Sequence, residues 1–499
     1  MENILAGLNV LASLKMMILL FAGLVLGFIV GALPGFSSSN AAAVLLPISI
    51  GFGLEEALVF MAALYTGAQF GGSVPAILIN TPGTAGAAAT ALDGYPMARK
   101  GQAALAIGIA RMGSVLGGLI GGLITLALLF PMSKFGLKFG TAELFLVALF
   151  GLTLISSLVG DAVRKGLISA GLGLLIAAMS ADPVLGVGRF TMGFIELYDK
   201  VPFVPILIGL FALSEMVALS RKIGKSKETS GNALNKESFK DIIDGIKTTI
   251  RYPIDVLRAS IIGLIVGIIP GTGTAVSNFI SYGIAKKTAK NPENFGKGDP
   301  RGIIASESCD SAVTGGTMIP TLTLGIPGST TAAIMLAAFY LHGVIPGPQV
   351  MVNHAPMAYA VVLSIIVSSI LILPVGILLA QPMVKISYLS PRILVPVVSF
   401  LCIIGAFAVS NSMFDAKLAF VFGLVGILMK YNGYPIVPLV LGVILGPIAE
   451  ANLVRALTIA KGDLGYFFQS PIAIAMWIII FLALFSGPIK KAIAKIRAK

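Results

Sequence analysis

The two halves of this 499-residue chain carry the same pattern of glycine and proline. The motif Gly-x-x-x-Gly-x-x-Pro-Gly at residues 27–35 recurs at residues 263–271, displaced by 236 residues with identical internal spacing. Two more pairs follow in the same order, namely residues 71–83 with 315–328 (a Gly pair, a Pro, then Pro-Gly) and residues 202–209 with 435–442 (Pro-x-Val-Pro-x-x-x-Gly). Internal duplication on this scale predicts two structural repeats of one unit.

The composition predicts that the solvent of this chain is a lipid bilayer. Hydrophobic residues make up 57% of the sequence and charged residues 11%, and the mean hydropathy is +0.97. A soluble domain has no need of so much apolar sequence. Apolar runs long enough, or nearly so, to cross a hydrocarbon core lie near residues 14–33, 104–130, 141–160, 201–219, 357–380, 392–409 and 471–487. We therefore predict an all-α polytopic membrane protein with roughly 11–14 membrane segments.

The net charge of +13 is concentrated beside the apolar runs. Basic residues cluster at 221–258, at 286–301 and in the tail at 490–499. Basic loops flanking apolar segments are typical of the cytoplasmic side of a membrane protein. The charge therefore indicates a topology in the bilayer and no nucleic-acid partner.

Loops at equivalent places in the two halves differ in charge. Loop 286–301 is basic, whereas the only charged residues of its counterpart at 51–56 are acidic, Glu55 and Glu56. Loop 96–101 is basic, whereas its counterpart at 346–356 carries no Lys or Arg. Equivalent loops would then face opposite sides of the membrane, which predicts two inverted-topology repeats.

The polar stretch between the halves divides the chain. We expect a first membrane repeat at residues 1–220, a cytoplasmic linker at 221–256 that contains a short amphipathic helix, and a second membrane repeat at 257–470. A final membrane helix and a basic cytoplasmic tail are expected at residues 471–499.

The segments 71–83 and 315–328 are poorly suited to a continuous helix, because each combines paired glycines, a proline and a terminal Pro-Gly. Irregular backbone at membrane depth is tolerated only where protein or a water-filled cavity surrounds it. We predict two broken or re-entrant helical hairpins that meet near the midplane and turn helix N-termini and free amides toward an anion. The alternative is a pair of kinked spanning helices whose glycines only permit close packing.

Small polar residues near these breaks are the candidate ligands. Hydroxyl and amide groups bind carboxylates, and their oxygens also bind sodium. The alternative for any single Ser or Thr is a hydrogen bond to the preceding helical turn. The substrate-binding candidates are Asn80, Thr81, Pro82, Gly83, Gly325, Ile326, Pro327, Gly328 and Ser329. The cation-coupling candidates are Ser39, Asn40, Thr274, Asn278 and Asp310.

Few ionisable residues fall within the expected membrane segments. Glu307 and Asp310 immediately precede the second break, and an acid at membrane depth predicts a cation or proton site. The alternative is a helix start at the water interface, which the nearby Asp299 and Arg301 favour. Asp93 is expected to shape a turn at the cytoplasmic end of its segment. Because deep Arg and Lys are scarce, we expect helix dipoles and bound cations to hold the anion.

The sequence offers little for enzymatic or cofactor chemistry. The chain has two cysteines, Cys309 and Cys402, and two histidines, His342 and His354, at spacings that suit no metal site. It contains no G-x-x-x-x-G-K-[ST] phosphate loop. We therefore expect no cofactor, no ATP hydrolysis and no enzymatic activity.

Several long motifs resemble one transporter family. They are Tyr-Thr-Gly-Ala-Gln-Phe-Gly-Gly-Ser at 65–73, Asn-Thr-Pro-Gly at 80–83, Ala-Leu-Asp-Gly-Tyr-Pro-Met-Ala-Arg-Lys-Gly at 91–101, Ile-Pro-Thr-Leu-Thr-Leu-Gly-Ile-Pro-Gly-Ser at 319–329 and Gly-Val-Ile-Pro-Gly-Pro at 343–348. In these motifs the chain resembles the large membrane subunit of tripartite tricarboxylate transporters, the TctA family. It departs from the family at 309–311, where Cys-Asp-Ser replaces an Asn-rich stretch.

The resemblance implies a secondary transporter in the cell inner membrane that depends on a binding protein. It would import tricarboxylates or related organic carboxylates by symport with sodium or protons. The implied partners are a small four-helix membrane subunit and an extracytoplasmic solute-binding protein. An anion channel or facilitator without cation coupling is the alternative.

Overall fold

The computed structural model describes residues 2–33, 35–158, 163–181, 187–198, 201–221, 239–269, 273–387, 389 and 391–482. Pro34, Pro270 and Gly271 of the first repeated motif lie outside the described residues. So do most of the expected linker and the basic tail. The domain bounds drawn from the sequence therefore stay predictions.

Helices dominate both halves. The first half contains α1 (Glu2–Leu11), α2 (Leu14–Gly31), α3 (Ser38–Leu45), η1 (Leu46–Gly51), α4 (Leu54–Gly71), α5 (Ser73–Ile79), α6 (Ala87–Arg99), α7 (Ala103–Gly136), α8 (Thr141–Leu158), α9 (Val163–Ala177), β1 (Ser180–Ala181), β2 (Gly188–Arg189), η3 (Ile195–Leu197), α10 (Phe203–Leu207), η4 (Ile208–Leu213) and α11 (Ser214–Ser220). The second half contains α12 (Phe239–Ile250), α13 (Pro253–Ile268), α14 (Gly273–Thr288), η6 (Pro292–Asn294), α15 (Pro300–Leu324), α16 (Thr330–Leu341), α17 (Pro348–Asn353), α18 (Ala355–Leu378), α19 (Ala380–Ser387), α20 (Pro391–Ser410), α21 (Met413–Tyr431), α22 (Ile436–Ile459) and η7 (Leu464–Phe468).

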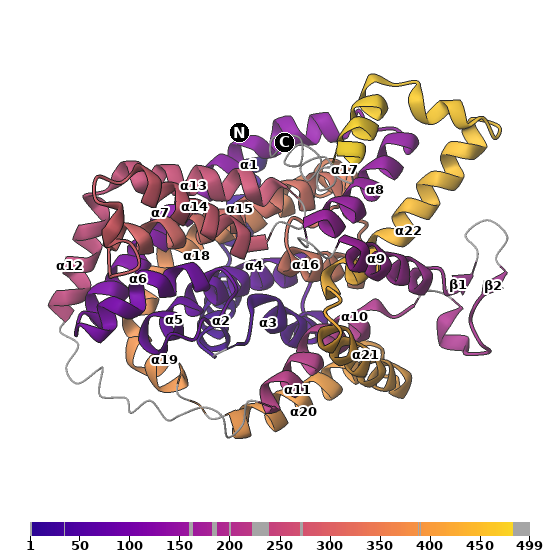
Figure 1. Ribbon diagram of the computed structural model, residues 1–499. Coiled ribbons are helices and arrows are strands. Elements are labelled where there is room, and N and C mark those ends of the chain that lie inside the picture. Colours follow the sequence, from indigo (N-terminus) through magenta and orange to yellow (C-terminus); the bar gives the residue numbers. More distant parts are fainter. Residues whose placement is uncertain are drawn as a thin grey trace, which may run out of the picture.

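The helices form two bundles that each draw on both halves of the chain (Figure 1). The first bundle contains α1, α2, α4–α7, α12–α15 and α18, and the second contains α8–α11 and α20–α22. Helices α3 and α16 contact members of both bundles. The small antiparallel sheet of β1 and β2 projects beyond the second bundle (Figure 1).

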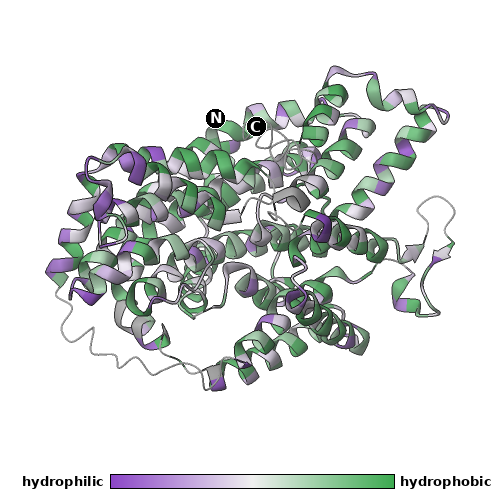
Figure 2. Ribbon diagram, in the orientation of Figure 1, coloured by the Kyte–Doolittle hydropathy of each residue, from purple (hydrophilic) through white to green (hydrophobic). Residues whose placement is uncertain are grey.

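The chain is an all-α polytopic membrane protein. Among the described residues, seven helices are long and apolar enough to cross a membrane: Leu14–Gly31, Leu54–Ile79, Ala103–Gly136, Phe203–Ser220, Ala355–Leu378, Arg392–Ser410 and Ile436–Ile459. Shorter apolar helices cover Ser38–Gly51, Thr141–Thr153, Thr330–Leu341 and Pro471–Leu482. Figure 2 shows hydrophobic residues along both bundles and hydrophilic ones gathered around α6, α12 and the loop between α14 and α15. The range of roughly 11–14 membrane segments stays a prediction.

The duplicated glycines make equivalent contacts in the two halves. A Cβ at Gly27 of α2 would lie 2.4 Å from the Leu64 carbonyl oxygen of α4, and a Cβ at Gly263 of α13 would lie 2.3 Å from that of Cys309 in α15. Leu64 and Cys309 are displaced by 245 residues, as are Pro75 and Pro320. Because glycine has no side chain, the helix backbones touch at these positions, as is common between closely packed membrane helices. Both halves therefore use one packing unit, while its inverted orientation across a bilayer stays a prediction.

The third repeated motif interlocks the halves in the second bundle. Gly442 on α22 packs against the Ala170 carbonyl of α9, and Gly209 in η4 packs against the Ala419 carbonyl of α21. Each copy of the motif thus packs on a helix of the other half. In the second bundle, helices of the first half therefore pack directly against helices of the second half.

In the second half the helix break occurs later than the glycine pair. Helix α15 continues through Gly315, Gly316 and Pro320, so the expectation that a continuous helix is unfavourable there was wrong. In the first half, α4 ends at Gly71 and α5 begins at Ser73. Polar groups of neighbouring helices and Ser or Thr side chains are able to re-satisfy the backbone groups that a proline leaves free in a membrane helix.

The two segments end in the same way. Asn80 after α5 and Gly325 after α15 both have left-handed backbone, with φ of 54° and 73°. Each donates its N–H to the carbonyl of a proline five residues earlier, Pro75 or Pro320. The chain then turns back, and the Gly83 N–H donates to the Gly72 carbonyl oxygen at 3.1 Å. We call residues 80–86 and 325–329 the first and second return loops.

The end of the linker forms the expected amphipathic helix. Helix α12 buries Ile242, Gly245 and Thr249, while Lys240, Asp241 and Lys247 are exposed. A Cβ at Gly245 would lie 2.3 Å from the Leu105 carbonyl oxygen of α7, and one at Gly108 would lie 2.3 Å from that of Ile242. The linker helix is therefore fixed to the first bundle by glycine contacts from both sides.

The contact of α2 with α4 generates a stability prediction. Gly27→Ala would place a methyl group against a backbone carbonyl that has no room to move, and overpacking of this kind costs about 1–3 kcal/mol. We expect a lower melting temperature for the detergent-solubilised full-length variant. The matched control is Gly171→Ala in α9, where a Cβ meets nothing within 4 Å and Ala is the better helix former. Equal effects of the two substitutions would contradict this account of the repeat.

Candidate functional site

The centre of the first bundle is a polar helix that other helices surround. Every residue of α15 from Gly302 to Thr323 is buried, although this stretch contains Glu307, Asp310 and several Ser and Thr residues. The helices packed around it include α4, α6, α7, α13, α14 and α18. An acid is tolerated at membrane depth when it faces protein partners. Both acids are therefore enclosed by protein, while the choice between a position at membrane depth and one at the water interface stays a prediction.

Glu307 is held by hydroxyl groups from three first-half helices. Its Oε1 accepts from Ser73 of α5 at 2.6 Å and from Thr90 of α6 at 2.5 Å. Its Oε2 accepts from Ser114 of α7 at 2.9 Å. Its side chain is fully enclosed, because Glu307 is 1% exposed. Hydrogen bonds donated to a carboxylate favour its charged form and offset part of the cost of burial.

Asp310 lies one turn further along α15 and has amide partners. Its Oδ1 accepts from Asn278 of α14 at 2.8 Å and from Gln69 of α4 at 3.4 Å. Gly86, the residue before α6, packs against the same oxygen, and a Cβ there would lie 2.0 Å from it. Asp310 thus joins the second half to the first return loop. We call Glu307, Asp310, Gln69, Asn278 and their hydroxyl partners Ser73, Thr90 and Ser114 the polar core.

The second return loop is joined to the first half in a similar way. The Tyr65 hydroxyl of α4 lies 3.1 Å from the Ser329 hydroxyl, and Ser38 of α3 lies 3.0 Å from Thr331 of α16. Ser329 also caps α16 by accepting from the Ala332 N–H at 3.1 Å. Each return loop therefore rests on helices of the other half.

The two return loops differ in their exposure. Asn80, Thr81 and Ala85 of the first loop are exposed, although most residues of α5 and α6 on either side are buried. Residues 325–329 of the second loop are all buried. The first return loop therefore reaches the surface of the chain, whereas the second is enclosed.

The sequence-predicted cation candidates separate into two groups. Asn278 and Asp310 are hydrogen-bonded to each other. Ser39 and Asn40 lie on α3, where Ser37 bonds the Ser39 hydroxyl at 2.9 Å and the Asn40 N–H at 3.3 Å. Thr274 lies in the first turn of α14, and its carbonyl accepts from Ser277 at 2.8 Å. The structure thus brings only two of the five candidates into the polar core.

Other members of the polar core escaped the sequence analysis. Gln69 and Ser73 belong to the motif at 65–73, so their place beside a repeated break was an available signal. Thr90 and Ser114 lie in alanine- and glycine-rich helices and gave no such signal. We expected few Arg or Lys residues deep in the protein and did not single out Arg111 of α7. Arg111 is 1% exposed and lies beside Gly376 of α18.

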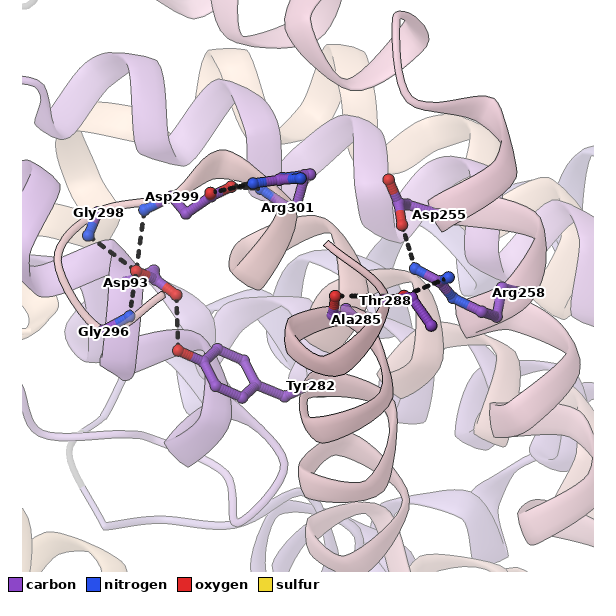
Figure 3. A network of polar contacts seen from close by, with 10 residues as sticks. All are labelled: Asp93, Asp255, Arg258, Tyr282, Ala285, Thr288, Gly296, Gly298, Asp299 and Arg301. Atoms are coloured by element: carbon purple, nitrogen blue, oxygen red, sulfur yellow. Dashed lines mark hydrogen bonds and ion pairs between the residues drawn. The ribbon is translucent and has the colours of Figure 1, made fainter. Parts of the chain in front are cut away.

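Asp93 clamps a loop of the other half. It lies in α6 and its Oδ1 accepts from the N–H groups of Gly296, Gly298 and Asp299 at 2.8, 2.8 and 2.9 Å, while its Oδ2 accepts from the Tyr282 hydroxyl at 2.8 Å (Figure 3). The expectation that Asp93 shapes a turn of its own segment was wrong, because the loop that it holds joins α14 to α15. This contact fixes the start of α15 against the first half.

Comparisons with known proteins place the chain in a family. Residues 17–441 match the model of the Tripartite tricarboxylate transporter TctA family. The chain belongs to the TctA family.

Two relatives of this TctA-family chain come from Agrobacterium vitis. One is described as an uncharacterized 52.8 kDa protein in the TAR-I ttuC' 3' region, and it is 35% identical over 91% of this chain and 90% of its own length. The other is described as an uncharacterized protein in the TAR-II ttuC' 3' region, and it is 33% identical over 43% of this chain and 88% of its own length. No solved structure matches the chain.

Membership of the TctA family makes this chain a component of a tripartite transport system. The family is one of transporters. Among the described residues, no group of three or more His, Cys, Asp or Glu side chains is placed to hold a metal ion.

The Asp93 clamp generates a prediction about the TctA-family chain. Asp93→Ala removes the acceptor of three backbone N–H groups, and each bond to a charged acceptor contributes about 1.5–3 kcal/mol. We expect faster tryptic cleavage at Lys290 or Lys297 and a lower melting temperature. Asp93→Asn is the matched control, because its Oδ1 still accepts from the same N–H groups. If the two variants were cleaved alike, the carboxylate would not hold the loop.

Proposed function

We propose that this chain is the large membrane subunit of a binding-protein-dependent secondary transporter in the inner membrane. It imports tricarboxylates or related organic carboxylates together with sodium or protons. Its proposed partners are a small four-helix membrane subunit and an extracytoplasmic solute-binding protein. TctA-family membership supports this assignment, and so does the arrangement of the return loops.

The observation that carries the proposal is that each return loop contacts helices of the opposite half. Asp310 meets the first loop at Gly86, and Tyr65 meets the second loop at Ser329. Two broken segments with helix starts inside the protein provide free amides and hydroxyls for an anion. We propose that Asn80–Gly83 and Gly325–Ser329 contact the substrate carboxylates.

The charges of the loops support the proposed orientation. Lys100 donates to the Lys297 carbonyl oxygen at 2.7 Å, which brings the basic loops at 96–101 and 286–301 together at one end of the first bundle. Both loops are assigned to the cytoplasm by the positive-inside pattern. This pairing agrees with the proposed inverted topology.

The difference in exposure between the loops supports alternating access. With Asn80 and Thr81 exposed and residues 325–329 buried, the proposed site is open from one side. We propose that the first bundle moves against the second, with α3 and α16 at the boundary between them. Bound cations would offset the substrate charge, because moving one charge against the membrane potential costs about 2.3 kcal/mol per 100 mV.

Uptake in cells that express the chain with and without its two proposed partners tests the function. We expect accumulation of labelled citrate, malate or succinate that needs both partners and is lost when one cation gradient is collapsed. Sodium and proton gradients are collapsed separately. A chain that only equilibrates these anions, with or without gradients, would be a channel or facilitator and would contradict the proposal.

A further inference from the structure

The two acids of the polar core place an electrostatic constraint on α15. Glu307 and Asp310 lie one helical turn apart and are 1% and 2% exposed. Like charges this close in a low-dielectric interior disfavour simultaneous ionisation. One of the two acids is therefore expected to be neutral for part of the transport cycle.

The hydrogen bonds distinguish the two acids. Glu307 accepts from three hydroxyls at 2.5–2.9 Å, and these bonds favour its carboxylate form. Asp310 has one bond of ordinary length, from Asn278 at 2.8 Å, and a long one from Gln69 at 3.4 Å. The charged form of Asp310 is thus less well satisfied than that of Glu307.

Gln69 lies beside Asp310 and has a buried amide oxygen without a hydrogen-bond donor. It is 1% exposed, its Nε2 faces the Asp310 carboxyl, and its Oε1 has no hydrogen-bond partner. A buried amide oxygen without a donor costs about 1–3 kcal/mol. A protonated Asp310 carries an O–H group, and rotation of the Gln69 amide by half a turn would present Oε1 to it. Gln69 can therefore donate to the carboxylate and accept from the carboxylic acid.

We propose that Asp310 is the proton-carrying residue of this transporter and that Gln69 is the partner that stabilises both of its protonation states. This inference rests on the proposed function and specifies its coupling ion as a proton. The proton comes from the water on one side, binds to a carboxylate oxygen of Asp310 and leaves to the water on the other side. No other bond forms or breaks.

The contact with Gly86 gives the proton a structural consequence. Asp310 lies at the N-terminus of α6, whose partial positive charge attracts a carboxylate. Protonation removes that attraction and so loosens the first return loop from α15. The protonation state of Asp310 thereby controls the loop that carries Asn80 and Thr81, which are exposed.

The other titratable groups around Asp310 do not replace it in this role. Glu307 and Cys309 neighbour it on α15, and Tyr65 faces it from α4. On α6, Asp93 is turned to the loop before α15, and on α7 the Arg111 guanidinium lies beside Gly376. The remaining charged or phenolic groups on the helices packed around α15 are Tyr282, Lys286 and Lys287 of α14, Asp255 and Arg258 of α13, Glu55 and Glu56 of α4, Tyr95 and Arg99 of α6, Lys134 of α7, Lys240, Asp241, Asp244 and Lys247 of α12, Tyr340 of α16 and Tyr359 of α18.

Infrared spectroscopy of the purified full-length protein tests the proton site without any transport assay. We expect a C=O band of a protonated carboxyl that disappears as the pH is raised. The band should be absent in Asp310→Asn and retained in Glu307→Gln. Asp415→Asn, which removes a buried acid of α21 in the second bundle, is the matched control and should also retain it. Loss of the band in Glu307→Gln, or its persistence in Asp310→Asn, would overturn the proposal.

A transport measurement completes the test. With labelled citrate, malate and succinate, Asp310→Asn should lose at least tenfold of proton-driven uptake while it still exchanges substrate across the membrane. Asp310→Glu should restore part of the proton dependence, which guards against a simple folding defect. Proton-driven uptake that survives in Asp310→Asn would overturn the proposal. If the wild type shows the carboxyl band but moves none of these anions, the proposed function fails and the proton site stands.

Discussion

The structure depends on the burial of one polar helix inside a membrane protein. Helix α15 carries two acids and a series of hydroxyl residues through the centre of the first bundle, where hydrocarbon would not accept them. It is tolerated because hydroxyls and amides from α4, α5, α6, α7 and α14 satisfy those acids. The surrounding helices therefore come from both halves of the chain, and the first return loop packs against Asp310 at Gly86.

Close helix contact makes this enclosure possible. Gly117 of α7 packs against the Ser308 carbonyl of α15, where a Cβ would lie 2.2 Å from the oxygen, and Gly263 of α13 meets the Cys309 carbonyl on another side. Between membrane helices the hydrophobic effect contributes little, so contact area and interhelical hydrogen bonds supply the stability. These glycines thus let the helix backbones approach α15 closely. The close approach brings the hydroxyl and amide partners within hydrogen-bond distance of its acids.

The all-α polytopic class could be predicted from the sequence, because apolar run length is a local property. The sequence predicted that the segment 315–328 would not be a continuous helix, and α15 in fact continues through Gly315, Gly316 and Pro320 and ends only at Leu324. Whether a helix continues past a proline depends on neighbours that re-satisfy the freed backbone group. Asp310 and Asn278 were identified because charge and amide are costly at depth. Thr90, Ser114 and Arg111 were missed, because pairing between distant helices leaves no pattern along the chain.

Side-specific thiol labelling measures the central claim most directly, namely that the return loops around α15 form the substrate site. The two native cysteines, Cys309 and Cys402, are buried, so the background is low. Thr81→Cys should react with a membrane-impermeant reagent from one side and be protected by the transported carboxylate, whereas Ser329→Cys should be unreactive in the same state. Labelling of Thr81→Cys that no carboxylate affects, or equal labelling at both positions from one side, would contradict the account.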